Sequence, residues 1–173
     1  GRYRAPLVVA ENLALIIRQE LLRLAEAGCR HIHLDEPALA SHQALPGELV
    51  RTVNAAIHGI PVTVGIHFAG NAPAQRSYAR LFPLILELEA PEVALEFASR
   101  EMCEADLWLT FNPGKRLCAG VLDARHSWVE TPEEVAGRIR TLLRFVPEDQ
   151  LTLAPDCGLA GIPRQAAFGK ICS

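Results

Sequence analysis

Apolar positions along the chain form two kinds of pattern that alternate with each other. From Leu13 to Leu24 they recur at the spacing of one helix face, and Gly28 supplies a stop signal. The same kind of pattern predicts further helices at 48–58, 74–88 with a break at Pro83, weakly at 101–111, from Thr131 onward and after Pro163. Thr131, Pro132 and Glu134 form the clearest helix start, because they make a capping box with proline at the first helical position.

Short apolar runs lie between the predicted helices. They predict strands in the stretch HIHLDEPAL from residue 31 and at 62–66, 93–99, 118–124 and 151–156. Strands that alternate with helices over short connections predict an α/β fold with a parallel sheet. The carboxyl ends of parallel strands share one rim, where sites are usually built. Polar residues follow these ends: Asp35, Glu36, His67, Glu96, Asp123, Asp156 and Cys157.

Composition narrows the class of protein. The chain has 173 residues, 50% hydrophobic, and a formal net charge of -3. We therefore expect a single domain over 1–173 with a real core, and no nucleic-acid partner, which would favour a basic face. No apolar run is long enough to cross a bilayer, so no membrane partner is expected. The 5 cysteines are widely spaced without a C-x-x-C pair, which favours reduced thiols and a cytoplasmic location.

Three of the strand-end residues suggest a metal site. Alternation along VALEFAS puts Glu96 on the face opposite Val93, and a buried carboxylate there needs a cation, a metal ion or a proton. An ion pair with a nearby arginine is the structural alternative. His67 and Cys157 are each weak signals alone, but with Glu96 they supply one nitrogen, one oxygen and one sulfur. Zinc accepts that mixture of ligands.

Other polar residues are less specific. Asp35 and Glu36 are either a charged loop or substrate-binding residues that Pro37 directs from the rim. Asp123 either caps its loop or acts together with His126. The remaining histidines, His31, His33, His42 and His58, show no spacing that suggests a metal site.

The ordered motifs IHLDEPAL, VGIHFAGN, VALEFAS, AGVLDARHSWVETPEEVAGRIR and LAPDCGL resemble the catalytic barrel of cobalamin-independent methionine synthases. The resemblance runs from about Leu13 to Lys170. It implies a (β/α)8 barrel of the TIM type, of which this chain supplies about strands four to eight. It also implies a zinc ion that activates the homocysteine thiol to accept a methyl group from a reduced folate.

The same resemblance assigns roles to individual residues. His67, Glu96 and Cys157 correspond to zinc ligands, whereas the cysteine of the family's H-x-C motif falls on Ala69. Asp35 corresponds to the residue that holds the substrate's amino group. Asp123 also corresponds to a family site residue, but Arg125 occupies the position of the proton-transferring histidine, with His126 beside it.

Two departures from the family leave alternatives open. Without the cysteine at Ala69 the site either retains zinc on three ligands or belongs to a metal-free paralogue or binding subunit. A complete barrel takes about 250 residues, so we expect a fragment, a split enzyme with a partner half-barrel, or self-association. The acceptor thiol is homocysteine or, as in some relatives, one like coenzyme M.

Overall fold

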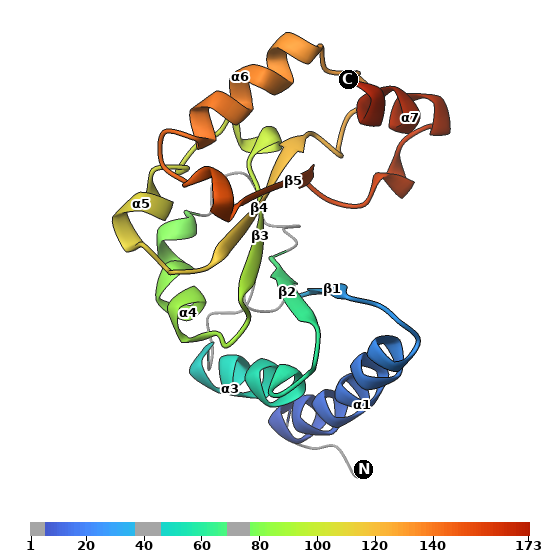
Figure 1. Ribbon diagram of the computed structural model, residues 1–173, viewed down its shortest axis with the longest axis vertical. Helices are drawn as coiled ribbons and strands as arrows, with labels where there is room; N and C mark the ends of the chain where they lie inside the picture. Colours follow the sequence, from blue (N-terminus) through green and yellow to red (C-terminus); the bar gives the residue numbers. More distant parts are fainter. Residues whose placement is uncertain (1–5, 37–45, 69–76) are drawn as a thin grey trace.

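The computed structural model describes residues 6–36, 46–68 and 77–173, and its centre is a parallel sheet (Figure 1). The strands lie side by side in chain order, β1-β2-β3-β4-β5, and each neighbouring pair is parallel. This confirms the α/β class and the parallel sheet. The strands are β1 His31–Asp35, β2 Thr63–His67, β3 Glu92–Glu96, β4 Arg116–Leu122 and β5 Leu151–Pro155.

Helices follow the strands and give the molecule the outline of a crescent (Figure 1). The longest, α1, ends one horn of the crescent and packs against α3, while α7 lies at the other horn. Among the described residues, no helix combines the length and the apolar character needed to cross a bilayer. The helices are α1 Pro6–Glu26, α3 Pro46–Ile57, α4 Phe82–Glu87, α5 Leu107–Phe111, α6 Pro132–Leu142 and α7 Arg164–Cys172.

Local sequence signals explain where several helices begin. The Thr131 side chain accepts the backbone N–H of Glu134, and the Glu134 side chain accepts the backbone N–H of Thr131, so the predicted capping box is confirmed. The helix expected at 74–88 with a break at Pro83 is interrupted in its described part, but before the proline and not at it. A 3-10 turn, Tyr78–Arg80, precedes the short α4, and Pro83 lies in the first turn of α4. There its missing N–H costs no hydrogen bond, so the proline starts a helix instead of kinking one.

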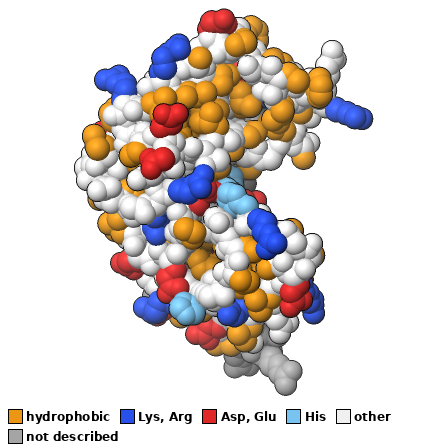
Figure 2. Space-filling model, viewed as in Figure 1, with side chains coloured by type: hydrophobic (Ala, Val, Ile, Leu, Met, Phe, Trp, Pro, Cys, Tyr) orange, Lys and Arg blue, Asp and Glu red, His pale blue; other side chains and the backbone are white. Residues whose placement is uncertain are grey.

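The sheet has an apolar outer face and a polar inner face. Ile66, Leu95 and Leu117 are buried in the core that the sheet shares with the helices. The alternate positions carry polar or small residues, including His33, Gly65, His67, Glu92, Glu96 and Gly120. The molecule is hollowed on one side, and histidine and basic side chains are visible at the hollow (Figure 2). Within the described residues, β1 and β5 each pair with one neighbour only.

Candidate functional site

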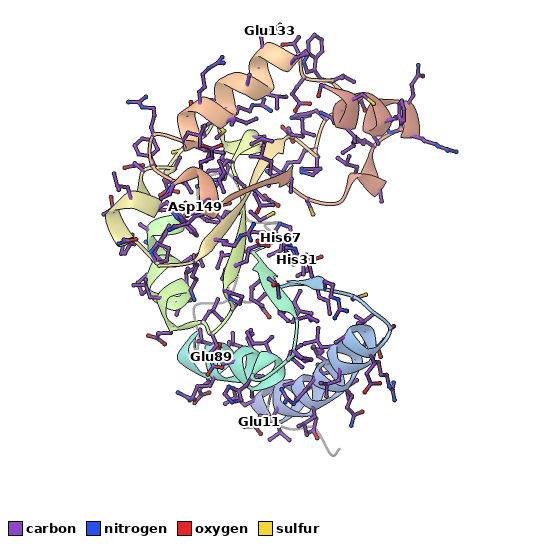
Figure 3. The ribbon with its side chains drawn as sticks, in the orientation of Figure 1. Glu11, His31, His67, Glu89, Glu133 and Asp149 are labelled. Carbon is purple, nitrogen blue, oxygen red and sulfur yellow. The ribbon has the colours of Figure 1, made fainter. Side chains whose placement is uncertain are left out.

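His67 ends β2 and is held from two sides. Its Nδ1 lies 2.8 Å from Oδ1 of Asp35, which is its register partner on β1. Its Nε2 donates toward the backbone carbonyl of Asp156, 3.0 Å away. A carboxylate on one ring nitrogen fixes the orientation of an imidazole and leaves the other nitrogen to meet a metal. Figure 3 places His67 at the middle of the crescent, near its hollow side.

Glu96 ends β3 and is buried, with 4% of its surface exposed. Its Oε2 lies 2.9 Å from Nη2 of Arg125. The ion pair considered as the structural alternative is therefore present. A metal bound by Glu96 would share this carboxylate with the arginine or displace it.

Tyr78 holds the backbone of Glu96 with a single hydroxyl. It donates to the Glu96 carbonyl at 2.8 Å and accepts the Glu96 N–H at 3.1 Å. Burial raises the pKa of Tyr78, so the hydroxyl keeps its proton. Arg100 lies over the tyrosine ring, 4.1 Å from its centre. Sequence reasoning missed Tyr78 because no local motif ties it to the strand.

Tyr78→Phe is expected to lower the free energy of unfolding by about 2 kcal/mol, because it removes two hydrogen bonds to the buried backbone of Glu96. Thermal and urea unfolding would measure the loss. Phe97→Leu is the packing control, because Phe97 contacts the Tyr78 ring but makes no hydrogen bond with its hydroxyl. A Tyr78→Phe variant as stable as the parent would show that the hydroxyl does not hold Glu96.

Cys157 follows β5 in a loop that Asp156 anchors. The buried Asp156 carboxylate accepts backbone N–H groups of Phe97, Ala98 and Ser99 at 3.0, 3.0 and 2.6 Å. Burial raises the pKa of Asp156, and these hydrogen bonds oppose the rise. The loop therefore joins the end of β5 to the segment after β3, and Cys157 itself is exposed.

His67 and Cys157 line one hollow on the inner face of the sheet, with a volume of about 210 Å³. Cys118 lines it too, but burial, followed by the charge of Glu92, raises its pKa to about 11. The Cys118 thiol is thus neutral near pH 7, which makes it a poor thiolate ligand in this hollow.

The remaining predicted site residues lie around the same rim. Oδ1 of Asp123 accepts the backbone N–H of Arg125 at 2.8 Å, and Oδ2 lies 3.7 Å from Nε2 of the exposed His126. The Glu36 N–H donates to the His67 carbonyl at 2.8 Å. The structure thus brings Asp123 to His126 and Asp35 to His67. Ala69 and Pro37 lie outside the described residues.

The rim residues include donor types that suit zinc, but their donor atoms are not yet close enough together to share one ion. His67 and Cys157 share the hollow, and Ala94, two residues before Glu96 on β3, lines it as well. In the described part of the chain, the donors of His67, Glu96 and Cys157 do not all lie within 4.8 Å of one another. Binding would exchange the His67–carbonyl and Glu96–Arg125 contacts for metal bonds.

A different set of donors is compact. The ligand atoms of His31, His33 and Glu92 all lie within 4.8 Å of one another. The expectation that His31 and His33 show no metal-type spacing is therefore wrong. In a strand, residues two apart point to the same face, so the H-x-H spacing in HIHLD was the available signal.

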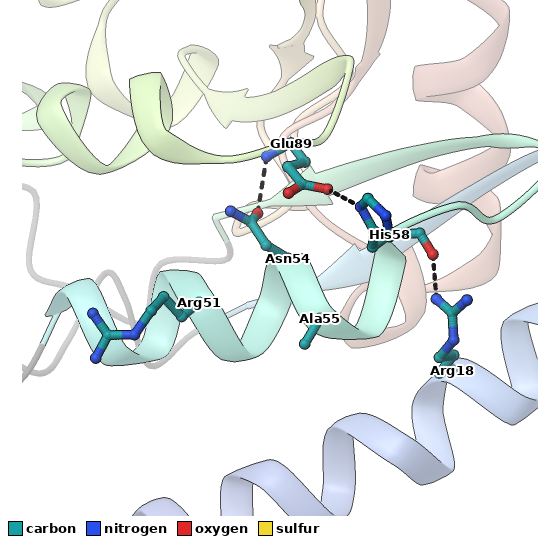
Figure 4. Close-up of a pocket in the computed structure, with 6 residues that line it drawn as sticks. All are labelled: Arg18, Arg51, Asn54, Ala55, His58 and Glu89. Atoms are coloured by element: carbon teal, nitrogen blue, oxygen red, sulfur yellow. Dashed lines mark hydrogen bonds and ion pairs between the residues drawn. The ribbon is translucent and has the colours of Figure 1, made fainter.

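A second hollow, of about 460 Å³, lies between α1 and α3 on the other side of the sheet (Figure 4). His58 Nδ1 lies 2.8 Å from Oε2 of Glu89, and Arg18 donates to the His58 carbonyl. Both side chains of the His58–Glu89 pair are more than half exposed. This pair provides a surface comparison for the histidines on the inner face.

Comparisons of the sequence with a family model and with curated proteins point to the same family. Residues 5–172 match the family model described as cobalamin-independent synthase, catalytic domain. A methionine synthase of Pyrococcus abyssi is 33% identical over 160 residues, which are 92% of this chain and 46% of that protein. One from Sulfurisphaera tokodaii is 31% identical over 169 residues, or 98% of this chain and 48% of that protein.

A solved structure extends the likeness to three dimensions. The B12-independent methionine synthase from Shewanella sp. W3-18-1, in complex with selenomethionine, superposes with a TM-score of 0.89 at 26% identity. The match covers 98% of this chain and 53% of that one. The expected partial TIM barrel is confirmed. The chain spans about half the length of the curated relatives it matches.

Proposed function

The chain belongs to the cobalamin-independent synthase family, within its catalytic domain, and from that premise we propose that it forms part of a zinc-dependent S-methyltransferase. The proposed reaction transfers a methyl group from a reduced folate to the thiol of homocysteine and yields methionine. The observation that carries this proposal is His67, with Asp35 behind its ring, sharing a hollow with the exposed Cys157. We place the reaction in the cytoplasm.

The proposed transfer balances as a displacement. The substrate thiol loses its proton, and an electron pair on sulfur forms the new bond to the methyl carbon. The bond between that carbon and the donor nitrogen breaks, its electron pair stays on nitrogen, and nitrogen takes up a proton. Bound zinc would supply a lowered thiol pKa, so that a thiolate is available at neutral pH.

Different side chains would bind the zinc, bind the substrate and carry the proton. His67, Glu96 and Cys157 would hold the zinc, with water or substrate in the fourth position. Asp35 orients His67 through Nδ1 and, at 70% side-chain exposure, can also reach the substrate's amino group, with Glu36 next to it. His126 is the proton carrier that we favour, because Asp123 lies beside it, whereas the Arg125 guanidinium is paired with Glu96.

We further propose that other residues complete the barrel, in a longer chain, in a partner half-barrel or in a second copy. Within the described residues, β1 and β5 leave one edge each without a strand, and parallel sheets are normally closed or covered. Large apolar side chains are exposed at both horns of the crescent, among them Leu15, Ile16, Phe168 and Ile171. The other partners in this proposal are the small-molecule thiol and the methyl donor.

Metal analysis of the full-length protein tests the zinc part of the proposal. Cys157→Ser and His67→Ala are each expected to hold about one zinc ion less than the parent and to lose methyl transfer. Cys103→Ser is the matched control, because Cys103 is also an exposed cysteine but lies outside the hollow. If zinc content and turnover are unchanged in Cys157→Ser, the proposed site is wrong. Parallel assays with homocysteine and with coenzyme M identify the acceptor thiol.

A metal-free binding subunit is the second candidate function. The contacts of His67 with the Asp156 carbonyl and of Glu96 with Arg125 favour it, because they occupy two of the three proposed ligands. Ala69→Cys separates the candidates. If the parent binds no zinc at the rim and Ala69→Cys restores it, the metal-free function holds; a parent that already binds and turns over excludes it.

A further inference from the structure

The inner face of the sheet carries a second cluster of metal-type donors, toward the amino ends of the strands. His31 is the first residue of β1, His33 follows two residues later, and Glu92 is the first residue of β3. His67 and Cys157, by contrast, lie at the carboxyl ends of their strands. We propose that His31, His33 and Glu92 bind a divalent transition-metal ion, with Zn²⁺ as the best match, independently of the rim site and of the methyl-transfer proposal.

The three donors already converge on one point. Oε1 of Glu92 lies 2.8 Å from Nε2 of His31 and 2.6 Å from Nε2 of His33. The two Nε2 atoms lie 3.2 Å apart. At zinc–nitrogen bonds of about 2.1 Å, two ligands of a tetrahedral ion lie about 3.4 Å apart. The imidazoles are thus nearly in place, and the carboxylate oxygen needs to withdraw by about 0.6–0.8 Å to admit the ion.

Gly65 makes this convergence possible across an intervening strand. It lies on β2 in register with His33 on one side and Glu92 on the other. Strands are about 4.8 Å apart, so side chains on β1 and β3 meet only if the residue between them leaves the space empty. A Cβ at position 65 would lie 2.7 Å from Nε2 of His33 and 3.2 Å from Oε1 of Glu92.

Glu92 has the electrostatic character of a buried ligand. Its side chain is 0% exposed, and its Oε2 accepts no hydrogen bond from the described residues. The Nε of Arg116 forms an ion pair with that oxygen at 3.7 Å, a distance beyond hydrogen-bond length, so it compensates part of the charge but does not bond the oxygen. A buried carboxylate with an unsatisfied oxygen is costly, and a divalent cation would satisfy both the charge and the oxygen.

The donor types and the access select the kind of metal. Two imidazoles and one carboxylate suit Zn²⁺ and its first-row neighbours, whereas Mg²⁺ and Ca²⁺ prefer oxygen ligands. In this part of the barrel the histidine side chains are 45% and 32% exposed, which leaves room for water in the open position. His31 lies on the hollow side of the crescent in Figure 3, and His33 lines the same hollow as the rim residues.

The test uses chelator-stripped full-length protein dialysed against Zn²⁺, with the bound metal counted. His33→Gln, His31→Gln and Gly65→Ala are each expected to bind about one ion less than the parent, with affinity at this site lowered about 100-fold or more, since even an outer-shell partner is worth 10–100-fold. His58→Gln is the control, because His58 also contacts a carboxylate at 2.8 Å but has no second histidine there. Circular dichroism confirms that each variant is folded, and the exposed His31 variant is the least disturbing of the three.

Co²⁺ distinguishes the two sites, because a thiolate ligand adds sulfur-to-metal charge-transfer absorption that a nitrogen and oxygen site lacks. Cys157→Ser should remove the sulfur band and spare the ion at His31, His33 and Glu92. His33→Gln should do the reverse. If His33→Gln and His31→Gln bind as much metal as His58→Gln, the second site is refuted, whatever happens at the rim. Loss of metal in Cys157→Ser alone would support the rim site and overturn this one.

Discussion

Glu130→Ala is expected to lower the free energy of unfolding by about 3–5 kcal/mol, the usual cost of removing one partner from a buried ion pair. The Glu130 and Lys170 side chains are 3% and 1% exposed, with Oε2 and Nζ 2.8 Å apart. Oε1 of Glu130 accepts from Arg138 at 3.2 Å and from the Asp123 backbone N–H at 2.8 Å. The carboxylate thus joins α7, α6 and the loop after β4, and its loss leaves the Lys170 ammonium buried without its anion.

The exposed acid Glu133, three residues further along in the first turn of α6, is the matched control, and Glu133→Ala should change stability by about 0.5 kcal/mol or less. Urea unfolding at neutral pH compares the two. A double variant with Lys170→Met should lose less than the sum of the single losses, because the apolar residue no longer leaves a charge behind. Equal losses for Glu130→Ala and Glu133→Ala would contradict this account of the ion pair.

The Glu130 carboxylate also makes the free energy of unfolding depend on pH in the acidic range. Burial alone would raise the pKa of Glu130, but hydrogen bonds from Lys170, the Asp123 backbone and Arg138 outweigh it and lower the pKa. A carboxyl group with a lower pKa in the folded state adds stability above its unfolded pKa, about 4.3, and loses it as the pH falls through the folded value. Below about pH 5 the parent should therefore lose stability more steeply than Glu130→Gln.

Local signals in the sequence account for the sheet and for part of the rim. The period-2 strands, the capping box at Thr131 and the polar strand ends all depend on residues close in the chain, and each led to a correct element or rim position. Glu130 and Lys170 are 40 residues apart in a loop and a helix, so no local pattern pairs them. Lysine is also a residue type that is rarely buried, so the identity of residue 170 does not suggest a place in the core.

The cluster on the inner face was missed for a related reason. The strand spacing of His31 and His33 is local, but Glu92 joins them only because β2 lies between β1 and β3 and carries Gly65 at the crossing point. Strand order and register are tertiary facts that periodicity does not contain. A glycine inside a strand was the remaining clue, since it often marks close approach of neighbouring groups.

Gly120→Ala is expected to lower the free energy of unfolding by about 3 kcal/mol and to disturb the rim, because the methyl group has no space. A Cβ at this position would lie 2.1 Å from Oδ1 of Asp156 and 2.6 Å from its Cα. The Cα belongs to the backbone, so a side-chain rotation cannot relieve the clash. The Asp156 carboxylate would have to leave the N–H groups of Phe97 and Ala98, and Cys157 would move with it.

The matched control carries the same substitution where there is room. Gly137 lies within α6 with nothing within 4 Å of an added Cβ, so Gly137→Ala should raise stability by about 0.5–1 kcal/mol through helix propensity. Urea unfolding should therefore give opposite signs for the two variants. Thiol labelling of the folded proteins should show an altered rate at Cys157 in Gly120→Ala alone. Equal stability of the two variants would mean that β5 can move away from β4 at little cost. In that case the hydrogen bonds between Asp156 and the segment after β3 would not be what holds Cys157 at the rim.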